Sequence, residues 1–348
     1  MGIALLDESV INKISAGEVI ERPASVVKEL VDNAIDAKAR RILVELEGSG
    51  KKLIKVTDDG IGMVRDDAIL SIERHATSKI ESEEDLASIR TLGFRGEALS
   101  SIAAVSKLKI RTNPDAMEGI ELTVEAGKVA AEKRVVIPKG TTVEAKELFY
   151  NVPARKKAMR SDATELRNCL DVMVDFALGN PELYLQLKDD GKSMLDSPGS
   201  DDLKSTIADV LGSQAAKDMI ELDQEEEEEE EEGIGISGFI SKPGFQRSDR
   251  NWQYLFINKR AVKNDTIREA VYEAYKGFLN ISKHPVFVLN IRMDPKLVDV
   301  NVHPQKKTVR LAEPEKTKQA IRAALSKALS SSSRVEVNVS KDKQMNLE

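Results

Sequence analysis

Cysteine, histidine and aromatic residues are scarce in this sequence. A single cysteine, Cys169, cannot form a disulfide within the chain, and together with only three histidines it cannot complete a cysteine-rich zinc site. Aromatic residues make up 4% of the chain, so we expect a core of mainly aliphatic side chains. These absences favour a reducing compartment, and we expect a cytoplasmic location.

Long apolar runs and targeting signals are also missing. No run approaches the ~18 residues of a membrane span. The first ten residues contain Asp7 and Glu8 and no basic start of a secretory signal, and Leu6 stands where a myristoylation signal needs Ser or Thr. The sequence therefore predicts neither export nor a lipid anchor nor a membrane partner.

Positive charge is in deficit, but one segment accounts for the deficit. The formal net charge is -7, and without the run of eight glutamates from Glu225 to Glu232 it becomes +1. Like charges at this density repel one another and bury nothing, so we expect a solvated, disordered insertion in a surface loop. The overall charge therefore does not exclude a nucleic-acid partner.

The length of 348 residues predicts two domains and a tail, at about 150 residues per domain. The turn-forming residues 196–200 mark a boundary, which gives a first domain over 1–200 and a second over 201–330 with the acidic loop 225–232. Beyond Ser330 the sequence is polar, so 331–348 is expected to begin a linker. Helices mix with antiparallel strands throughout, which predicts an α+β fold.

Apolar periodicity predicts the elements of each domain. In the first domain we expect helices over 15–37, 97–104 and 162–178, and strands over 42–46, 53–56, 105–112, 120–125, 133–137, 141–147 and 182–187. In the second we expect helices over 202–211, 264–278 and 314–329, and strands over 233–241, 252–257 and 286–292.

The segment from Gly48 to Lys52 resembles a phosphate-binding loop only superficially. A P-loop needs Ser or Thr directly after its lysine, to hold magnesium, and Lys52 stands there instead. We therefore expect a hairpin turn between the strands at 42–46 and 53–56.

A stronger candidate for nucleotide chemistry lies in the first long helix. Glu29, Asn33 and Asp36 recur at intervals of four and three residues, which places them on one helix face. A carboxylate near an amide oxygen suits magnesium, which takes one or two protein oxygens beside water and phosphates. The turn 58–62 and the loop 93–99, where two glycines bracket Arg95 ahead of a helix, favour an anion site in the same domain.

These segments resemble the GHKL ATPases and, within them, the MutL family of DNA mismatch repair proteins. The loop Gly93-Phe94-Arg95-Gly96-Glu97-Ala98-Leu99 is similar to the family signature letter for letter. Further similar segments lie at 14–19, 74–79, 149–155 and 300–306, in the expected order. The resemblance implies an α+β fold made of a GHKL (Bergerat) ATP-binding sandwich followed by a ribosomal protein S5 domain 2-like domain, with 331–348 leading toward a C-terminal dimerisation domain.

The resemblance implies a role for each matching residue. Glu29 would be the general base and Asn33 the Mg²⁺ ligand, while Lys306 would reach the γ-phosphate from the second domain as a further catalytic residue. Lys307 beside it is an open alternative. The remaining ATP-binding residues implied are Asp36, Asp58, Gly62, Thr77, Ser78, Lys79, Gly93, Phe94, Arg95, Gly96, Ala98, Leu99 and Thr142. Asp58 would accept a hydrogen bond from the adenine amino group, and the loop from Gly93 would close as a lid.

The implied function is a slow, switch-type ATP hydrolase. ATP would drive dimerisation through the N-terminal domain and coordinate a MutS-type mismatch recognition protein with a downstream nuclease or helicase. Non-specific DNA binding would use basic residues, for which the candidates are Arg155, Lys156, Lys157, Lys259, Arg260, Lys263 and Arg268. The expected location is cytoplasmic, at the nucleoid if the source is prokaryotic.

Other GHKL proteins remain as alternatives at this point. A type II topoisomerase ATPase subunit shares the two domains and the reaching lysine but lacks the signature at 93–99. A chaperone of the Hsp90 kind, a histidine kinase and an ATP-binding scaffold without hydrolysis are further alternatives, and the kinase is disfavoured because no phosphoacceptor helix pair precedes the first helix.

Overall fold

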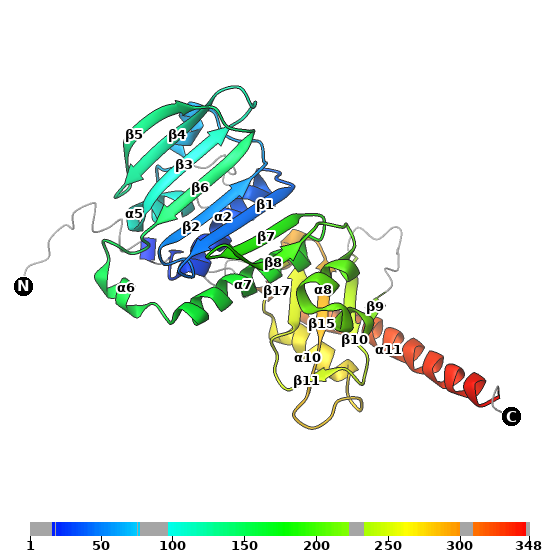
Figure 1. Ribbon diagram of the computed structural model, residues 1–348. Coiled ribbons are helices and arrows are strands. Elements are labelled where there is room, and N and C mark those ends of the chain that lie inside the picture. Colours follow the sequence, from blue (N-terminus) through cyan, green and yellow to red (C-terminus); the bar gives the residue numbers. More distant parts are fainter. Residues whose placement is uncertain are drawn as a thin grey trace, which may run out of the picture. The chain divides into compact units, whose positions relative to one another are not determined.

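The computed structural model describes residues 16–17, 19–74, 76, 97–222, 233–299 and 309–345, with side chains described as far as 331. The chain divides into two compact units. Unit 1 comprises Met1–Ala177 and Pro181–Asp202, and unit 2 comprises Leu178–Asn180 and Leu203–Glu348. Each unit has its own sheet and helices (Figure 1).

Unit 1 is built on one mixed sheet of eight strands in the order β5-β4-β3-β6-β2-β1-β7-β8 (Figure 1). The strands are β1 Arg41–Glu47, β2 Leu53–Asp58, β3 Lys107–Asn113, β4 Gly119–Glu125, β5 Lys128–Val135, β6 Gly140–Lys146, β7 Tyr184–Asp189 and β8 Lys192–Ser197. Only β1 and β7 pair in parallel; the other neighbours are antiparallel.

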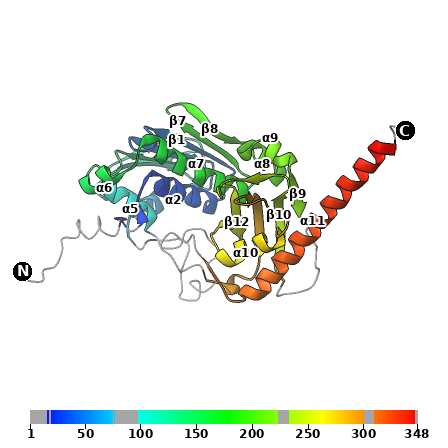
Figure 2. The ribbon, with the colours of Figure 1, turned by 90° about the horizontal axis from the view of Figure 1, so that it is seen from below.

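Helices cover one face of this sheet, as Figure 2 shows for α2, α5 and α7. The helices of unit 1 are α2 Pro23–Asp36, α3 Arg65–Leu70, α5 Ala98–Val105, α6 Pro153–Ala158 and α7 Asp162–Gly179. Alternate residues of the central strands are buried, among them Val44, Val56 and Ile110, because successive strand side chains point to opposite faces. The aliphatic core predicted from the low aromatic content lies between this face and the helices.

The side chains that point to the other face of this sheet include several charged residues. Glu121 of β4 is buried among cations, since Arg111 of β3 and Lys133 of β5 lie 2.5 and 3.0 Å from its carboxylate. Arg111 also reaches Glu144 of β6 at 3.3 Å. Ion pairs across adjacent strands therefore stabilise the face that the helices leave uncovered.

The turn between β1 and β2 confirms the hairpin prediction and explains why it is no P-loop. The two strands pair antiparallel, from Ile42 opposite Asp58 to Glu47 opposite Leu53. The backbone N–H of Gly48 donates to Asp190 at 3.1 Å, and that of Ser49 donates to Asp189 at 3.0 Å. The carboxylates of Asp189 and Asp190 thus accept the hydrogen bonds from the backbone N–H groups that a phosphate would need.

Unit 2 contains a five-stranded sheet in the order β13-β12-β15-β10-β9, packed against α10 and α11. Its larger elements are α8 Leu203–Leu211, α9 Ser213–Lys217, β9 Met219–Leu222, β10 Gly235–Ser241, β12 Gln253–Ile257, α10 Asp265–Ala274, β15 Phe287–Arg292 and α11 Pro314–Met345. The short elements are β11 Gln246–Arg247, β13 Arg260–Ala261, β14 His284–Pro285, η1 Pro295–Leu297, β16 Val298–Asp299 and β17 Arg310–Leu311. Ile321, Leu325 and Leu329 of α11 are fully or nearly fully buried in its core.

The α+β class is confirmed, and the differences from the predicted elements have local causes. The helix predicted over 15–37 is divided: Ala16, Gly17 and Val19 are helical, and α2 begins at Pro23, in keeping with the fixed φ that suits proline to a first turn. The strand β8 was not predicted and runs to Ser197, into the turn-forming residues 196–200, and the two units divide just after these residues, at Asp202 and Leu203. The predicted end of the last helix at 329 is wrong: α11 continues to Met345 through most of 331–348, since adding turns to a packed helix needs no new nucleus.

Candidate functional site

Helix α2 carries the three polar residues that the sequence singled out. Glu29, Asn33 and Asp36 are all half-buried, whereas Val27, Leu30 and their apolar neighbours face the core. Lys28 forms an ion pair with the buried Asp32 at 2.6 Å and lies 3.7 Å from Glu29. The structure thus places a carboxylate and an amide, one turn apart, at the edge of the core.

The end of α2 docks directly onto the turn that follows β2. The backbone N–H of Ile61 donates to the carbonyl of Ala37 at 2.9 Å. The carboxylate of Asp59 accepts the backbone N–H groups of Arg40 and Arg41, both at 2.8 Å. These bonds hold the C-terminal end of α2, the helix that carries Glu29 and Asn33, against the turn with Asp58.

Asp58 is the carboxylate of this turn with an unusual protonation equilibrium. Burial raises its pKa from the ordinary 3.8 to about 6, although hydrogen bonds from the backbone N–H groups of Gly60 and Thr141 pull the pKa down. Asp59 next to it adds a smaller upward effect. A buried carboxylate that keeps some acceptor capacity is suited to a ligand that donates a hydrogen bond.

Two glycines near Asp58 lie so close to neighbouring backbone atoms that a side chain at either position would clash. Gly62 has φ +69°, and a Cβ there would lie 2.2 Å from the carbonyl oxygen of Asn113. Gly140 has φ +125°, and a Cβ there would lie 2.1 Å from the carbonyl oxygen of Asp58. Because the obstructing atoms are backbone, any side chain at either position would force the turn apart.

Thr142 lies on β6, opposite Thr57 of β2, one residue pair away from Asp58 and Thr141. Its hydroxyl is 3.3 Å from that of Thr57. The neighbouring hydroxyl of Thr112 accepts the backbone N–H of Met63 at 2.9 Å, which holds the segment after Gly62 against β3. Asp58, Gly62 and Thr142 are therefore gathered at one end of β2 and β6.

The predicted lid is described only at its end. Ala98 and Leu99 are half-buried in the first turn of α5, and within the described chain no side chain caps that turn. The remaining predicted ATP-binding residues, both candidate lysines and the acidic run lie outside the described residues. They are Thr77, Ser78, Lys79, Gly93, Phe94, Arg95, Gly96, Lys306, Lys307 and 225–232.

The basic candidates for DNA contact fall on α6 of unit 1 and around β13 and α10 of unit 2. Lys156 and Lys157 are exposed on α6, and Lys263 is exposed ahead of α10. Arg268 pairs with Asp265 at 2.8 Å, and Lys259 and Arg260 belong to the turn and strand after β12. Arg155 differs from this group because its guanidinium donates to backbone carbonyls within unit 1.

Two residues of the site were missed by sequence reasoning. The backbone carbonyl of Asn113 lies against Gly62. The side-chain amide of Asn113 donates a hydrogen bond to the carbonyl of Ile137 at 2.7 Å, and its oxygen accepts hydrogen bonds from the backbone N–H groups of Asp115 and Ala116. The dipeptide Asn113-Pro114 is a turn signal that could have indicated this bend. Gly140 carried no signal of its own, since its conformation is imposed by the neighbouring β2.

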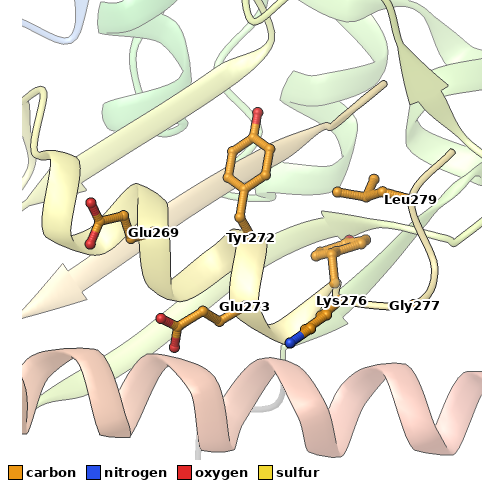
Figure 3. Close-up of a pocket in the computed structure, with 7 residues that line it drawn as sticks. Glu269, Tyr272, Glu273, Lys276, Gly277 and Leu279 are labelled. Atoms are coloured by element: carbon orange, nitrogen blue, oxygen red, sulfur yellow. The ribbon is translucent and has the colours of Figure 1, made fainter. Parts of the chain in front are cut away.

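A separate depression of about 440 Å³ lies in unit 2, beside α10 (Figure 3). Glu269, Tyr272 and Lys276 are among the residues that line it. Glu273, on the same side of the helix, points toward α11, where Lys318 and Arg322 lie 2.8 and 3.1 Å from it. The depression contains none of the predicted nucleotide residues.

Comparison with known families matches both units. Residues 20–161 match the family described as histidine kinase-, DNA gyrase B-, and HSP90-like ATPase. Residues 207–330 match the family described as DNA mismatch repair protein, C-terminal domain. Among the described residues, no helix has the length and apolar character required to cross a membrane.

Individual relatives agree with this match. DNA mismatch repair protein MutL of Symbiobacterium thermophilum is 45% identical over 328 residues, which cover 94% of this chain and 51% of the relative. The protein of the same name from Streptococcus equi subsp. equi is 44% identical, over 93% of this chain and 48% of its own. The chain spans about half the length of the curated relatives it matches.

Solved structures give the same result. The Aquifex aeolicus MutL ATPase domain complexed with ADP is similar at 32% identity and a TM-score of 0.58, over 80% of this chain and 94% of that one. The N-terminal domain of a DNA repair protein is similar at 27% identity and a TM-score of 0.79, over 92% of this chain and 98% of that one.

Proposed function

Because this chain belongs to the MutL family of DNA mismatch repair proteins, with a GHKL-type ATPase domain, we propose that it binds Mg²⁺ and ATP in unit 1, hydrolyses ATP slowly and pairs with a second copy when ATP is bound. The observation that carries the proposal is the gathering of Asp58, Gly62 and Thr142 beside the helix that presents Glu29 and Asn33. Family membership also favours this reading over a type II topoisomerase subunit.

The adenine base would lie against the end of β2. Asp58 would accept a hydrogen bond from the amino group of adenine, a donor that guanine does not offer at that position. Gly62 would let the backbone pass close to the ring. Support comes from the raised pKa of Asp58, which indicates a carboxylate deprived of water in this structure. Thr142 would contact the same end of the nucleotide.

The residues present fit a magnesium nucleotide. Asn33 supplies a half-buried amide oxygen one turn from Glu29, and a single such ligand suits Mg²⁺, which keeps several waters and takes oxygens from phosphates. When bound, the metal ion would neutralise negative charge on the phosphates. Glu29 would accept the proton of the attacking water, and Ala98 and Leu99 would place the first amides of α5 near the phosphates.

The switch would depend on residues beyond this part of unit 1. Lys306, or Lys307, would contact the γ-phosphate from the second domain, so that hydrolysis releases the contact. Pairing through the N-terminal domain would coordinate a MutS-type protein with downstream repair. Non-specific DNA binding would use Lys156 and Lys157 of unit 1 and, separately, Lys259, Arg260, Lys263 and Arg268 of unit 2.

The test combines ATP hydrolysis with association. We expect slow steady-state hydrolysis by the chain, loss of at least about 100-fold in kcat for Glu29→Ala, and a shift to dimer on gel filtration with a non-hydrolysable ATP analogue and Mg²⁺. A chain that neither hydrolyses ATP nor dimerises with the analogue would refute the proposal. Normal hydrolysis by Glu29→Ala would refute the assignment of the base, and Lys306→Ala beside Lys307→Ala separates the two lysines.

A further inference from the structure

The guanidinium of Arg155, on α6, holds two backbone carbonyls that lie 138 and 135 residues earlier in the chain. Its Nη1 donates to the carbonyl of Gly17 at 2.8 Å and to that of Ile20 at 2.9 Å. Both acceptors precede α2, in the stretch that leads into the helix with Glu29. Ile20 is fully buried, so this stretch is packed as well as hydrogen-bonded.

Gly17 and Arg155 are complementary in shape. A Cβ built on Gly17 would lie 1.7 Å from Nη2 of Arg155 and 2.2 Å from its Cζ. The guanidinium therefore fills the space that a side chain at residue 17 would need. Because the obstructing group is the end of a flexible side chain, an alanine at 17 would displace Arg155 and leave the backbone in place.

The segment that carries Arg155 is anchored on its other side to α5. The side-chain amide of Asn151 donates to the carbonyl of Ala104 at 2.8 Å, and the backbone N–H of Phe149 donates to that of Val105 at 2.7 Å. Phe149 is fully buried. Residues 149–155 thus tie the end of α5, whose first turn holds the end of the predicted lid, to the stretch ahead of α2.

We propose that Arg155 is a positioning residue for the nucleotide site. Its guanidinium clamps the carbonyls of Gly17 and Ile20, so that the stretch entering α2 and the helix following the lid share one support. The inference rests on the proposed function, since it is Glu29 on α2 that the clamp would position. A lysine cannot replace it, because an ammonium has no counterpart to the Cζ and Nη2 atoms that fill the space beside Gly17 while Nη1 donates to both carbonyls.

The first test needs no nucleotide. Hydrogen exchange of backbone amides over residues 19–25 is compared for the wild type, Arg155→Ala, Arg155→Lys and Gly17→Ala. We expect exchange about tenfold faster in all three variants, as the loss of hydrogen bonds from a charged group implies. Arg134→Ala is the matched control, because Arg134 is an exposed arginine on β5 that pairs only with Glu118 in the described contacts. Unchanged exchange in Arg155→Ala would overturn the proposal.

The second test is the double variant Gly17→Ala/Arg155→Ala. Removing the guanidinium vacates the space that the alanine needs, so the double variant should exchange as fast as Arg155→Ala alone, within about twofold. Each single change would remove the same hydrogen bonds from the Arg155 guanidinium, so the second change has nothing further to remove. Additive acceleration would show that Gly17 and Arg155 act independently and would overturn the pairing.

The third test separates positioning from general stability. Arg155→Ala and Gly17→Ala should lower kcat for ATP about tenfold and leave KM within about twofold, because the clamp does not touch Asp58 or Gly62. A lowered melting temperature with unchanged kcat and KM would mean a structural role only and would overturn the proposal. If the wild type hydrolyses no ATP, the proposed function fails, while the exchange measurements still decide whether the clamp exists.

Discussion

We expect the ionised Asp58 to lower the free energy of unfolding of the domain, although the same carboxylate is proposed to recognise adenine. Burial raises its pKa from 3.8 to about 6. Keeping the carboxylate ionised at neutral pH therefore costs about 3 kcal/mol, at about 1.36 kcal/mol per pKa unit. Asp58→Asn removes this cost but weakens the hydrogen bonds from Gly60 and Thr141. We expect a net gain of about 1–2 kcal/mol at pH 7.5, or about 2–8 °C in melting temperature.

The pH dependence distinguishes this cause from any other. A carboxyl whose pKa is raised by folding carries its penalty above the folded pKa of about 6, and the penalty is relieved as the pH falls from there toward 3.8. The difference in unfolding free energy between Asp58→Asn and the wild type should therefore shrink by about 1.4 kcal/mol between pH 7.5 and pH 5. Other titrating groups cancel in this difference.

Urea unfolding at the two pH values measures the effect, and calorimetric titration with an ATP analogue measures the loss of recognition. Affinity for the ATP analogue should fall about 10- to 100-fold in Asp58→Asn, because the NH2 group of the new side chain and the adenine amino group are both hydrogen-bond donors. Asp59→Asn is the matched control: that carboxylate accepts the N–H groups of Arg40 and Arg41, so nucleotide affinity should persist. A destabilised Asp58→Asn, or a difference independent of pH, would refute the reasoning.

Three further changes test other parts of the structure. Glu121→Gln should destabilise unit 1 by about 1–2 kcal/mol at pH 7, a figure reduced for solvent screening of its partners. Burial works against ionisation of Glu121, but Arg111 and Lys133 outweigh it and lower its pKa to about 2, so the loss measured by denaturation should disappear as the pH falls from 4.5 toward 2. Gly62→Ala should abolish ATP-analogue binding in calorimetry, because its Cβ meets a backbone carbonyl; wild-type affinity would contradict the close approach. Asn264→Ala should cost about 1–2 kcal/mol in urea unfolding, since its side chain caps α10 by accepting the N–H of Ile267 at 3.0 Å; an unchanged midpoint would rule out that cap.

Sequence reasoning predicted well wherever one element carries the information. The face of α2 with Glu29, Asn33 and Asp36 follows from helical spacing, and the hairpin at 48–52 follows from its glycines and from the absence of a hydroxyl after Lys51. Both predictions depend on residues that are neighbours in the chain or one turn apart. Local periodicity is sufficient for such features.

Features that depend on distant segments were missed for a physical reason. Arg155 was interpreted as a DNA contact because it stands beside Lys156 and Lys157, yet its guanidinium is held by carbonyls near the start of the chain. The strand β8 was not predicted because its residues are mostly polar, and an edge strand can be polar where only alternate side chains reach the core. In both cases tertiary contacts, which no local pattern encodes, decided the role.

The strand β5 ends the sheet of unit 1 and leaves one side of its backbone without a neighbouring strand among the described residues. Nearly every side chain on it is exposed, and Lys128, Glu132, Lys133 and Arg134 give it dense charge. Charged edges resist the addition of further strands, which would otherwise join copies of the chain into open-ended filaments. This charged edge therefore disfavours self-association through added strands.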